Sequence, residues 1–186
     1  MKFFILMLAA VVYTTATAQK GIDNDILKRL DRELELKATY DQRKIDRIDS
    51  LRNIDANSLE ERYQVLCEVA REYETFVSDS ALAYYEHALD IAHELNDSSA
   101  AIKALLGKIK VMSIMGFFHE AMTELSITEQ KGIPKQLHKE WFDCGRQLYS
   151  YIEAYTLQGN SSNMNRYIDE YVARQALYRT ELLKLL

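Results

Sequence analysis

Apolar residues recur at helical spacing along most of the chain, and short polar breaks divide this pattern into segments. From Asn24 to about Arg52 there is no glycine or proline, and charges of both signs surround a narrow apolar stripe. The stripe consists of Leu27, Leu30, Leu34, Ile45, Ile48 and Leu51. This pattern predicts one long amphipathic helix within residues 19–56. Because charged residues interrupt the stripe in its middle, we favour packing against the following helices over a coiled-coil arm.

The rest of the chain shows shorter helical segments. Ser58 followed by Glu61 is a capping-box pattern, which predicts that a helix begins there. The expected helices cover residues 58–76, 81–95, 100–115, 118–129, 134–158 and 163–186. We therefore expect an all-α domain over residues 57–186.

Turn residues stand between these segments. Ser78 or Asp79 is expected to cap the helix that follows the break at 77–80. Gly116 is a natural left-handed helix stop. Pro134, the only proline, is expected at the first position of its helix. With one proline and six glycines, the chain also has too little turn chemistry for a many-stranded β fold.

The predicted helices group into pairs, at about 58–95, 97–129 and 134–186. Ala81 and Tyr85 in the first pair have counterparts Ala121 and Leu125 forty residues later. A small residue lets two helices approach closely, and a large one fills the gap to the next pair. In the third pair the corresponding residues are Gly159 at the turn, then Met164 and Ile168. This pattern predicts an α-solenoid of three tetratricopeptide-like antiparallel pairs, with an irregular helical bundle as the alternative.

The N-terminus has the layout of a secretory signal peptide. Lys2 precedes an unbroken apolar run, Phe3–Val12, and small residues follow at Ala16–Ala18. We expect cleavage after Ala18 and export to the periplasm, without membrane insertion of the mature chain; an uncleaved anchor or a buried helix is the alternative. Loss of Lys2 changes the formal charge from −5 to −6. An acidic chain without a basic cluster argues against nucleic acid as a partner.

Three segments carry a resemblance to a known family. They are Leu30–Leu34, Tyr40–Arg52 and Phe76–Tyr85. They resemble the opening helix and first repeat turn of Bacteroidota membrane-bound tetratricopeptide regulators. The resemblance implies a periplasmic sensory region, followed in that family by a membrane helix and a cytoplasmic output region. The chain ends at Leu186 without those parts, so we do not expect it to signal by the family's route alone.

Motifs for catalysis or for a cofactor are absent from the sequence. His87 and His93 are six residues apart, so they do not share the helical face that two metal ligands require. The sequence has no nucleophile elbow, Walker A loop or dinucleotide fingerprint. We expect Cys67 and Cys144 to be small buried residues that form no disulfide, because a solenoid places their helices a whole repeat apart. The prediction is a protein that is not an enzyme and that has no metal or cofactor site.

A binding groove is predicted from the first helices of the three pairs. Aligning Ala70, Ile109 and Ile152 as equivalent core positions places three columns of residues on the inward face. The candidate groove residues are Gln64, Arg71, Lys103, Lys110, Arg146, Tyr149 and Glu153, with Cys67 and Leu106 beside them. Because four are basic in an acidic protein, they predict a groove for a carboxylate or an acidic peptide segment. The alternative is that they are solvated surface charges.

The function expected from these observations is protein or peptide binding by the sensory module of an exported regulator. The alternative is a free periplasmic adaptor or scaffold with no signalling role. The apolar end of the chain, Leu182–Leu186, also predicts docking onto a further repeat or self-association.

Overall fold

The computed structural model describes the backbone of residues 2–158 and 165–186, and the side chains of residues 25–157 and 169–186. Within these residues the protein has seven α-helices, one short 3-10 helix and no strand. The elements are α1 (Lys2–Arg52), α2 (Leu59–Tyr73), α3 (Ser78–Glu94), α4 (Ser98–Met115), α5 (Phe118–Lys131), η1 (Lys135–Leu137), α6 (His138–Gln158) and α7 (Asn165–Leu183). The chain divides into two compact units, residues 1–47 and 48–186.

The first unit is the greater part of α1. This helix begins at Lys2, not at the predicted Asn24, and it continues through Gly21 into the charged segment. Leu27, Leu30 and Leu34 each keep more than half of their surface exposed.

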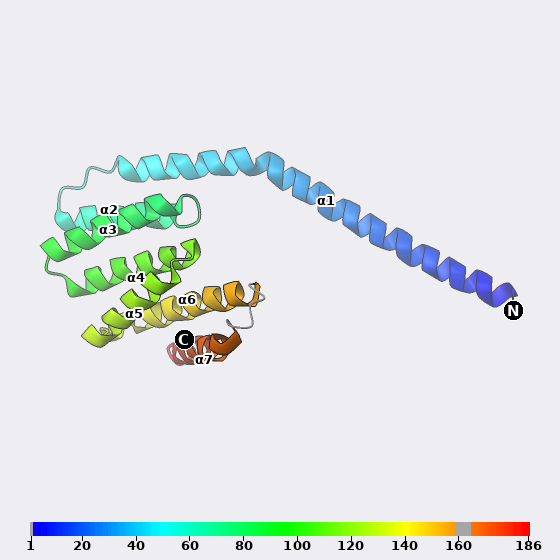
Figure 1. The fold of residues 1–186 in the computed structure, drawn as a ribbon. Helices are drawn as coiled ribbons and strands as arrows, with labels where there is room; N and C mark the ends of the chain where they lie inside the picture. Colours follow the sequence, from blue (N-terminus) through cyan, green and yellow to red (C-terminus); the bar gives the residue numbers. More distant parts are fainter. Residues whose placement is uncertain (1, 159–164) are drawn as a thin grey trace. The chain divides into compact units, whose positions relative to one another are not determined.

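The second unit contains three antiparallel helix pairs, α2 with α3, α4 with α5, and α6 with α7 (Figure 1). This confirms the predicted all-α solenoid of tetratricopeptide type. Ile48 and Leu51, at the end of α1, are buried against Val69 of α2 and so close the first end of its core. The largest apolar cluster joins α4, α5, α6 and α7 around Trp141 and Leu148.

The forty-residue register of the first two pairs is confirmed. Ala81 and Ala121 have no exposed surface, and Tyr85 and Leu125 are almost completely buried. Each alanine therefore lies where its helix meets a neighbour, and each large side chain fills the adjoining gap. Of the third pair, Gly159 and Met164 and the side chain of Ile168 lie outside the described residues.

Two of the predicted helix boundaries are confirmed in detail. The backbone N–H of Glu61 donates to Ser58 Oγ at 3.1 Å, so Ser58 caps α2. The Glu61 carboxylate accepts from the backbone N–H of Asn57 at 2.7 Å, so the box closes one residue earlier than the usual pattern. Gly116 ends α4 with φ of 83°, the left-handed conformation that favours glycine.

Two other boundary predictions were wrong. Neither Ser78 nor Asp79 caps α3, because the backbone N–H of Val77 already bonds Tyr73 O and the new helix starts at Ser78 itself. The Ser78 hydroxyl instead donates to the carbonyl of Glu74 at 3.3 Å. Pro134 is not the first residue of α6, because the 3-10 helix η1 lies between them.

Gly107 and Gly145 lie inside helices, where each lets an aromatic ring cross directly over the backbone. A Cβ atom at Gly107 would lie 2.3 Å from the ring of Tyr85, and one at Gly145 would lie 2.5 Å from the ring of Tyr178. Tyr85 comes from α3 and Tyr178 from α7, so the two glycines set the α3–α4 and α6–α7 contacts. The sequence interpretation assigned glycines to turns only and did not anticipate this role.

Both cysteines are free and buried, in agreement with the view that they are small core residues. Cys144 Sγ lies 3.6 Å from the carbonyl oxygen of Leu106, to which it donates. Burial raises the pKa of the Cys144 thiol to about 12, so the thiol stays protonated and unreactive at neutral pH.

Candidate functional site

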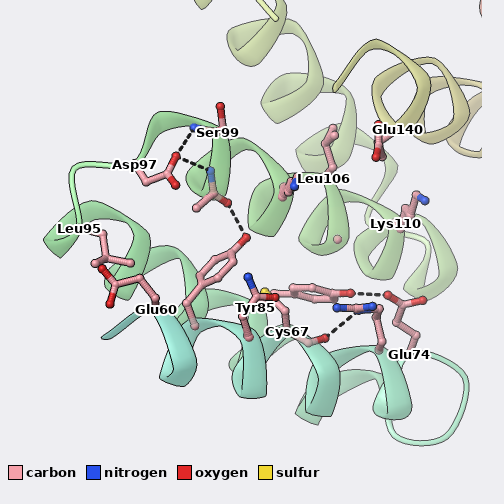
Figure 2. Close-up of a pocket in the computed structure, with 16 residues that line it drawn as sticks. Glu60, Cys67, Glu74, Tyr85, Leu95, Asp97, Ser99, Leu106, Lys110 and Glu140 are labelled. Atoms are coloured by element: carbon pink, nitrogen blue, oxygen red, sulfur yellow. Dashed lines mark hydrogen bonds between the residues drawn. The ribbon is translucent and has the colours of Figure 1, made fainter. Parts of the chain in front are cut away.

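A cleft in the second unit runs along α2 and α4 and has a volume of about 530 Å³ (Figure 2). α2 and the residue that ends it contribute one helical face: Glu60, Tyr63, Gln64, Cys67, Arg71 and the C-cap Glu74. α4 contributes Lys103, Leu106, Gly107 and Lys110 from its corresponding face. We call this the α2–α4 cleft.

The floor of the α2–α4 cleft is made of buried side chains held by hydrogen bonds. Tyr63 donates its hydroxyl to the carbonyl of Ala100 at 2.8 Å, and Tyr85 donates to Glu74 Oε1 at 2.5 Å. Burial raises the pKa of both tyrosines above the usual range, so both hydroxyls remain donors at physiological pH. The floor is therefore fixed before any ligand arrives.

Three cationic side chains surround this floor. They differ in whether they already form hydrogen bonds or ion pairs within the protein. The Arg71 Nε donates to the carbonyl of Cys67 at 3.2 Å, and its terminal guanidinium nitrogens have no hydrogen-bond partner among the described residues. Lys110 Nζ forms an ion pair with Asp143 at 3.2 Å. Lys103 is exposed and has no ion-pair partner in the part of the chain that the structure describes. Lys103 is thus the cation most available to an incoming anion.

Four acidic residues also line the α2–α4 cleft, and two of them already accept hydrogen bonds within the protein. Glu74 accepts from Tyr85, and Asp97 caps α4 by accepting from the backbone N–H groups of Ser99 and Ala100. The other two, Glu60 and Glu140, are exposed. In Figure 2, Glu60 and Asp97 lie at one end of the cleft, and Glu74 and Lys110 lie at the other. The cleft is therefore mixed in charge, and Lys110 lies away from its Glu60 end.

Four of the seven predicted groove residues come together in this cleft: Gln64, Arg71, Lys103 and Lys110. The other three do not line it. Arg146 is held by Asp143 at 2.8 Å, and the ring of Tyr149 stacks on Tyr178 with centroids 5.8 Å apart. Glu153 lies further along α6, on a half-buried part of the helix. Tyr178 of α7 therefore covers the Tyr149 ring, and Asp143 already holds Arg146.

Asp143 links the cleft to the third helix pair. Its carboxylate accepts from Lys110, from Arg146 and from the side-chain amide of Gln147 at 2.7 Å. Partial burial opposes ionisation, but the hydrogen bond from Arg146 and the charge of Lys110 outweigh it and lower the pKa of Asp143. This acid therefore holds Lys110 at the cleft and joins α4 to α6.

We expect Asp143→Asn to lower the free energy of unfolding at pH 7 by about 1 kcal/mol, because the side chain is partly exposed. A carboxyl with a lowered folded-state pKa stabilises the fold above its unfolded pKa of about 3.9, and that stabilisation is lost as the pH falls through the folded value. Urea unfolding at pH 7 and at acid pH measures both effects. The parent should lose stability more steeply than the variant below about pH 4; equal acid slopes would contradict the assignment.

The sequence interpretation missed the acids and both floor tyrosines of the cleft, namely Glu60, Glu74, Asp97, Glu140, Tyr63 and Tyr85. For α2 the sequence could have indicated them. Glu60, Tyr63 and Glu74 lie at helical spacing on the same face as Gln64 and Arg71. For Glu140 there was no such signal, since its position depends on how α6 packs beside α4.

Other kinds of site receive no support from the described residues. They contain no group of three or more histidine, cysteine, aspartate or glutamate side chains that could hold a metal ion. No helix in the described part of the chain is both long enough and apolar enough to span a membrane.

Comparisons with known proteins place the chain in a family. Searches of curated proteins and of solved structures each found no match. A family model described as the SusR N-terminal TPR domain matches residues 34–186. This match covers most of the chain, and it agrees with the resemblance to tetratricopeptide regulators and with the paired helices of the second unit. The chain therefore belongs to the SusR N-terminal TPR domain family.

Proposed function

We propose that this chain is the non-catalytic sensing region of an exported regulator, and that its α2–α4 cleft binds an anionic peptide segment. Membership of a tetratricopeptide family supports a role in protein interaction. The observation that carries the finer proposal is an open cleft with a buried, preorganised floor and an unengaged lysine, Lys103, on its wall.

The shape of the cleft suits an extended segment. α2 and α4 are the first helices of successive pairs, and both line the cleft along their length. A peptide lying between them contacts the apolar floor, where Cys67, Tyr85 and Leu106 are almost completely buried. Apolar contact supplies affinity, while the few polar groups on the walls set orientation.

The charges on the walls favour an anion at one end. Lys103 and the free guanidinium nitrogens of Arg71 can donate to a carboxylate without breaking an existing ion pair. Glu60, exposed at the other end, repels a second anion there. The ligand that fits is a short peptide whose acidic end, or C-terminal carboxylate, lies beside Arg71 and Lys103.

A library of short fluorescent acidic peptides with free C-terminal carboxylates tests this proposal by anisotropy. We expect at least one peptide to bind, and Lys103→Glu to weaken it at least tenfold, which corresponds to about 1.4 kcal/mol. Lys139→Glu is the matched control, because it changes charge equally on an exposed lysine outside the cleft. Peptides with amides in place of every acid should bind weakly to the parent.

Two results would refute peptide binding in the cleft. One is a library in which no acidic peptide binds the folded chain. The other is equal affinity of the parent and Lys103→Glu for every peptide that does bind.

Export is part of the same proposal and rests on the N-terminal pattern of Lys2, the apolar run Phe3–Val12 and the small residues Ala16–Ala18. Expression with the native N-terminus, followed by fractionation and intact mass measurement, checks it. We expect the periplasmic fraction to contain a form that begins at Gln19. A full-length mass, or recovery only from the cytoplasm, would contradict export.

A further inference from the structure

The outer face of α7 is apolar and uncovered in the single chain. The inner face packs on α6 through Tyr178, whose ring lies against Trp141, Phe142 and Tyr149. The opposite face presents Val172, Ala173, Ala176, Thr180 and Leu183, all of them exposed. Figure 1 shows α7 beside α6 as the last helix of the array.

The spacing of these residues makes a continuous stripe along the helix. Val172, Ala176, Thr180 and Leu183 follow each other at intervals of four, four and three residues, which places them on one helical face. Leu183 keeps 61% of its surface exposed and Val172 keeps 38%. An apolar stripe with alanines at its centre suits close approach of another helix.

The charges at the two ends of this stripe have opposite sign. Asp169 lies on the stripe face at the N-terminal end, and Lys184 follows Leu183 at the C-terminal end. Two copies of α7 packed in parallel would place like charges together. Two copies packed antiparallel, with Ala176 of each at the twofold axis, place each Asp169 against Lys184 of the other copy.

Neighbouring charges do not oppose that arrangement. Lys184 pairs with Glu181 in the single chain, but the side chain of Lys184 is 62% exposed and such surface pairs are weak, so it can exchange partners. Arg174 lies on the far side of α7, near Tyr149. Arg179 is exposed at the edge of the stripe.

We propose that the chain forms a twofold-symmetric homodimer through antiparallel packing of α7 on α7. A twofold interface uses the same patch on both copies, and this patch is complementary to itself in shape and in charge. The site goes beyond the expectation from Leu182–Leu186, because the stripe begins at Val172 and does not include Leu182, which is half-buried. It also does not depend on the α2–α4 cleft.

Analytical ultracentrifugation of the purified full chain tests the dimer. We expect a concentration-dependent dimer for the parent and a monomer for Ala176→Glu, which places two carboxylates at the axis. Asp169→Lys and Lys184→Asp should each weaken association roughly tenfold, because each creates like-charge contacts twice in the dimer. The double variant Asp169→Lys with Lys184→Asp restores the opposite-charge pairs and should recover most of the affinity.

Two controls separate the interface from folding and from the cleft. Circular dichroism should show the same helix content in every variant, since all the changed residues are exposed. Arg174→Glu, on the far side of α7, and Lys103→Glu, in the cleft, should both leave the dimer unchanged. A parent that stays monomeric at high concentration would overturn the proposal, as would a dimer that survives Ala176→Glu. Failure of the double variant to recover affinity would overturn the antiparallel arrangement.

Discussion

Replacing Gly107 by alanine should destabilise the chain by about 1–3 kcal/mol, although alanine is the better helix former. The added Cβ would lie 2.3 Å from two ring atoms of Tyr85, a distance that real Cβ atoms essentially never show. The ring cannot move aside easily, because Tyr85 is 4% exposed and its hydroxyl is bound to Glu74. α3 and α4 must therefore separate, which disturbs the core between the first two pairs. Thermal unfolding should show a fall of about 2–4 °C per kcal/mol.

A double-mutant cycle with Tyr85 identifies the cause. Tyr85→Ala alone should cost about 3–5 kcal/mol, because it empties a buried aromatic site. Adding Gly107→Ala to that background should cost nothing or stabilise the helix by up to about 1 kcal/mol. If Gly107→Ala stabilises the parent chain, or costs the same with and without the Tyr85 ring, the close approach is not what requires glycine.

Replacing Gly145 by alanine should detach α7 while leaving the other pairs intact. The new Cβ would lie 2.5 Å from the Tyr178 ring, which holds α7 on α6. α7 packs on α6 and on no other helix to a comparable extent, and repeat structures transmit strain mainly to the nearest neighbour. Hydrogen exchange should therefore show lost amide protection in residues 169–183 and retained protection in α2, α3 and α4.

The contrast between the two glycines provides the control. Gly107→Ala should weaken protection on both sides of the α3–α4 contact, because that contact lies inside the array. Uniform loss of protection in Gly145→Ala would mean that the third pair unfolds cooperatively with the rest. Unchanged protection of α7 would mean that the Tyr178–Gly145 contact does not hold it.

The helices and most of their ends could be read from local chemistry. Ser58 with Glu61 and Gly116 were correctly placed because a cap or a left-handed stop depends on a few neighbouring residues. Ala81 with Tyr85 and Ala121 with Leu125 were correctly paired because a repeat records its packing in spacing. The predictions for Ser78, Asp79 and Pro134 were wrong by one or a few residues, since several local arrangements can end a turn at similar cost.

The candidate site was predictable only in part. Gln64, Arg71, Lys103 and Lys110 share a cleft because α2 and α4 follow the regular repeat. Arg146, Tyr149 and Glu153 do not join them; Tyr178 of α7 covers the Tyr149 ring, and Asp143 holds Arg146. Whether a side chain on a repeat helix is open to a ligand depends on the next helix in space, which periodicity does not report.

Local sequence was enough for the all-α class, the paired helices and the tetratricopeptide family, because these depend on spacing, caps and small residues. The packed structure alone reveals why Gly107 and Gly145 carry no side chain, since each faces a ring from a different helix. It alone also shows which charges are engaged and which face of α7 is uncovered. Those properties depend on distances between residues far apart in the chain, and the hydrophobic pattern constrains them only weakly.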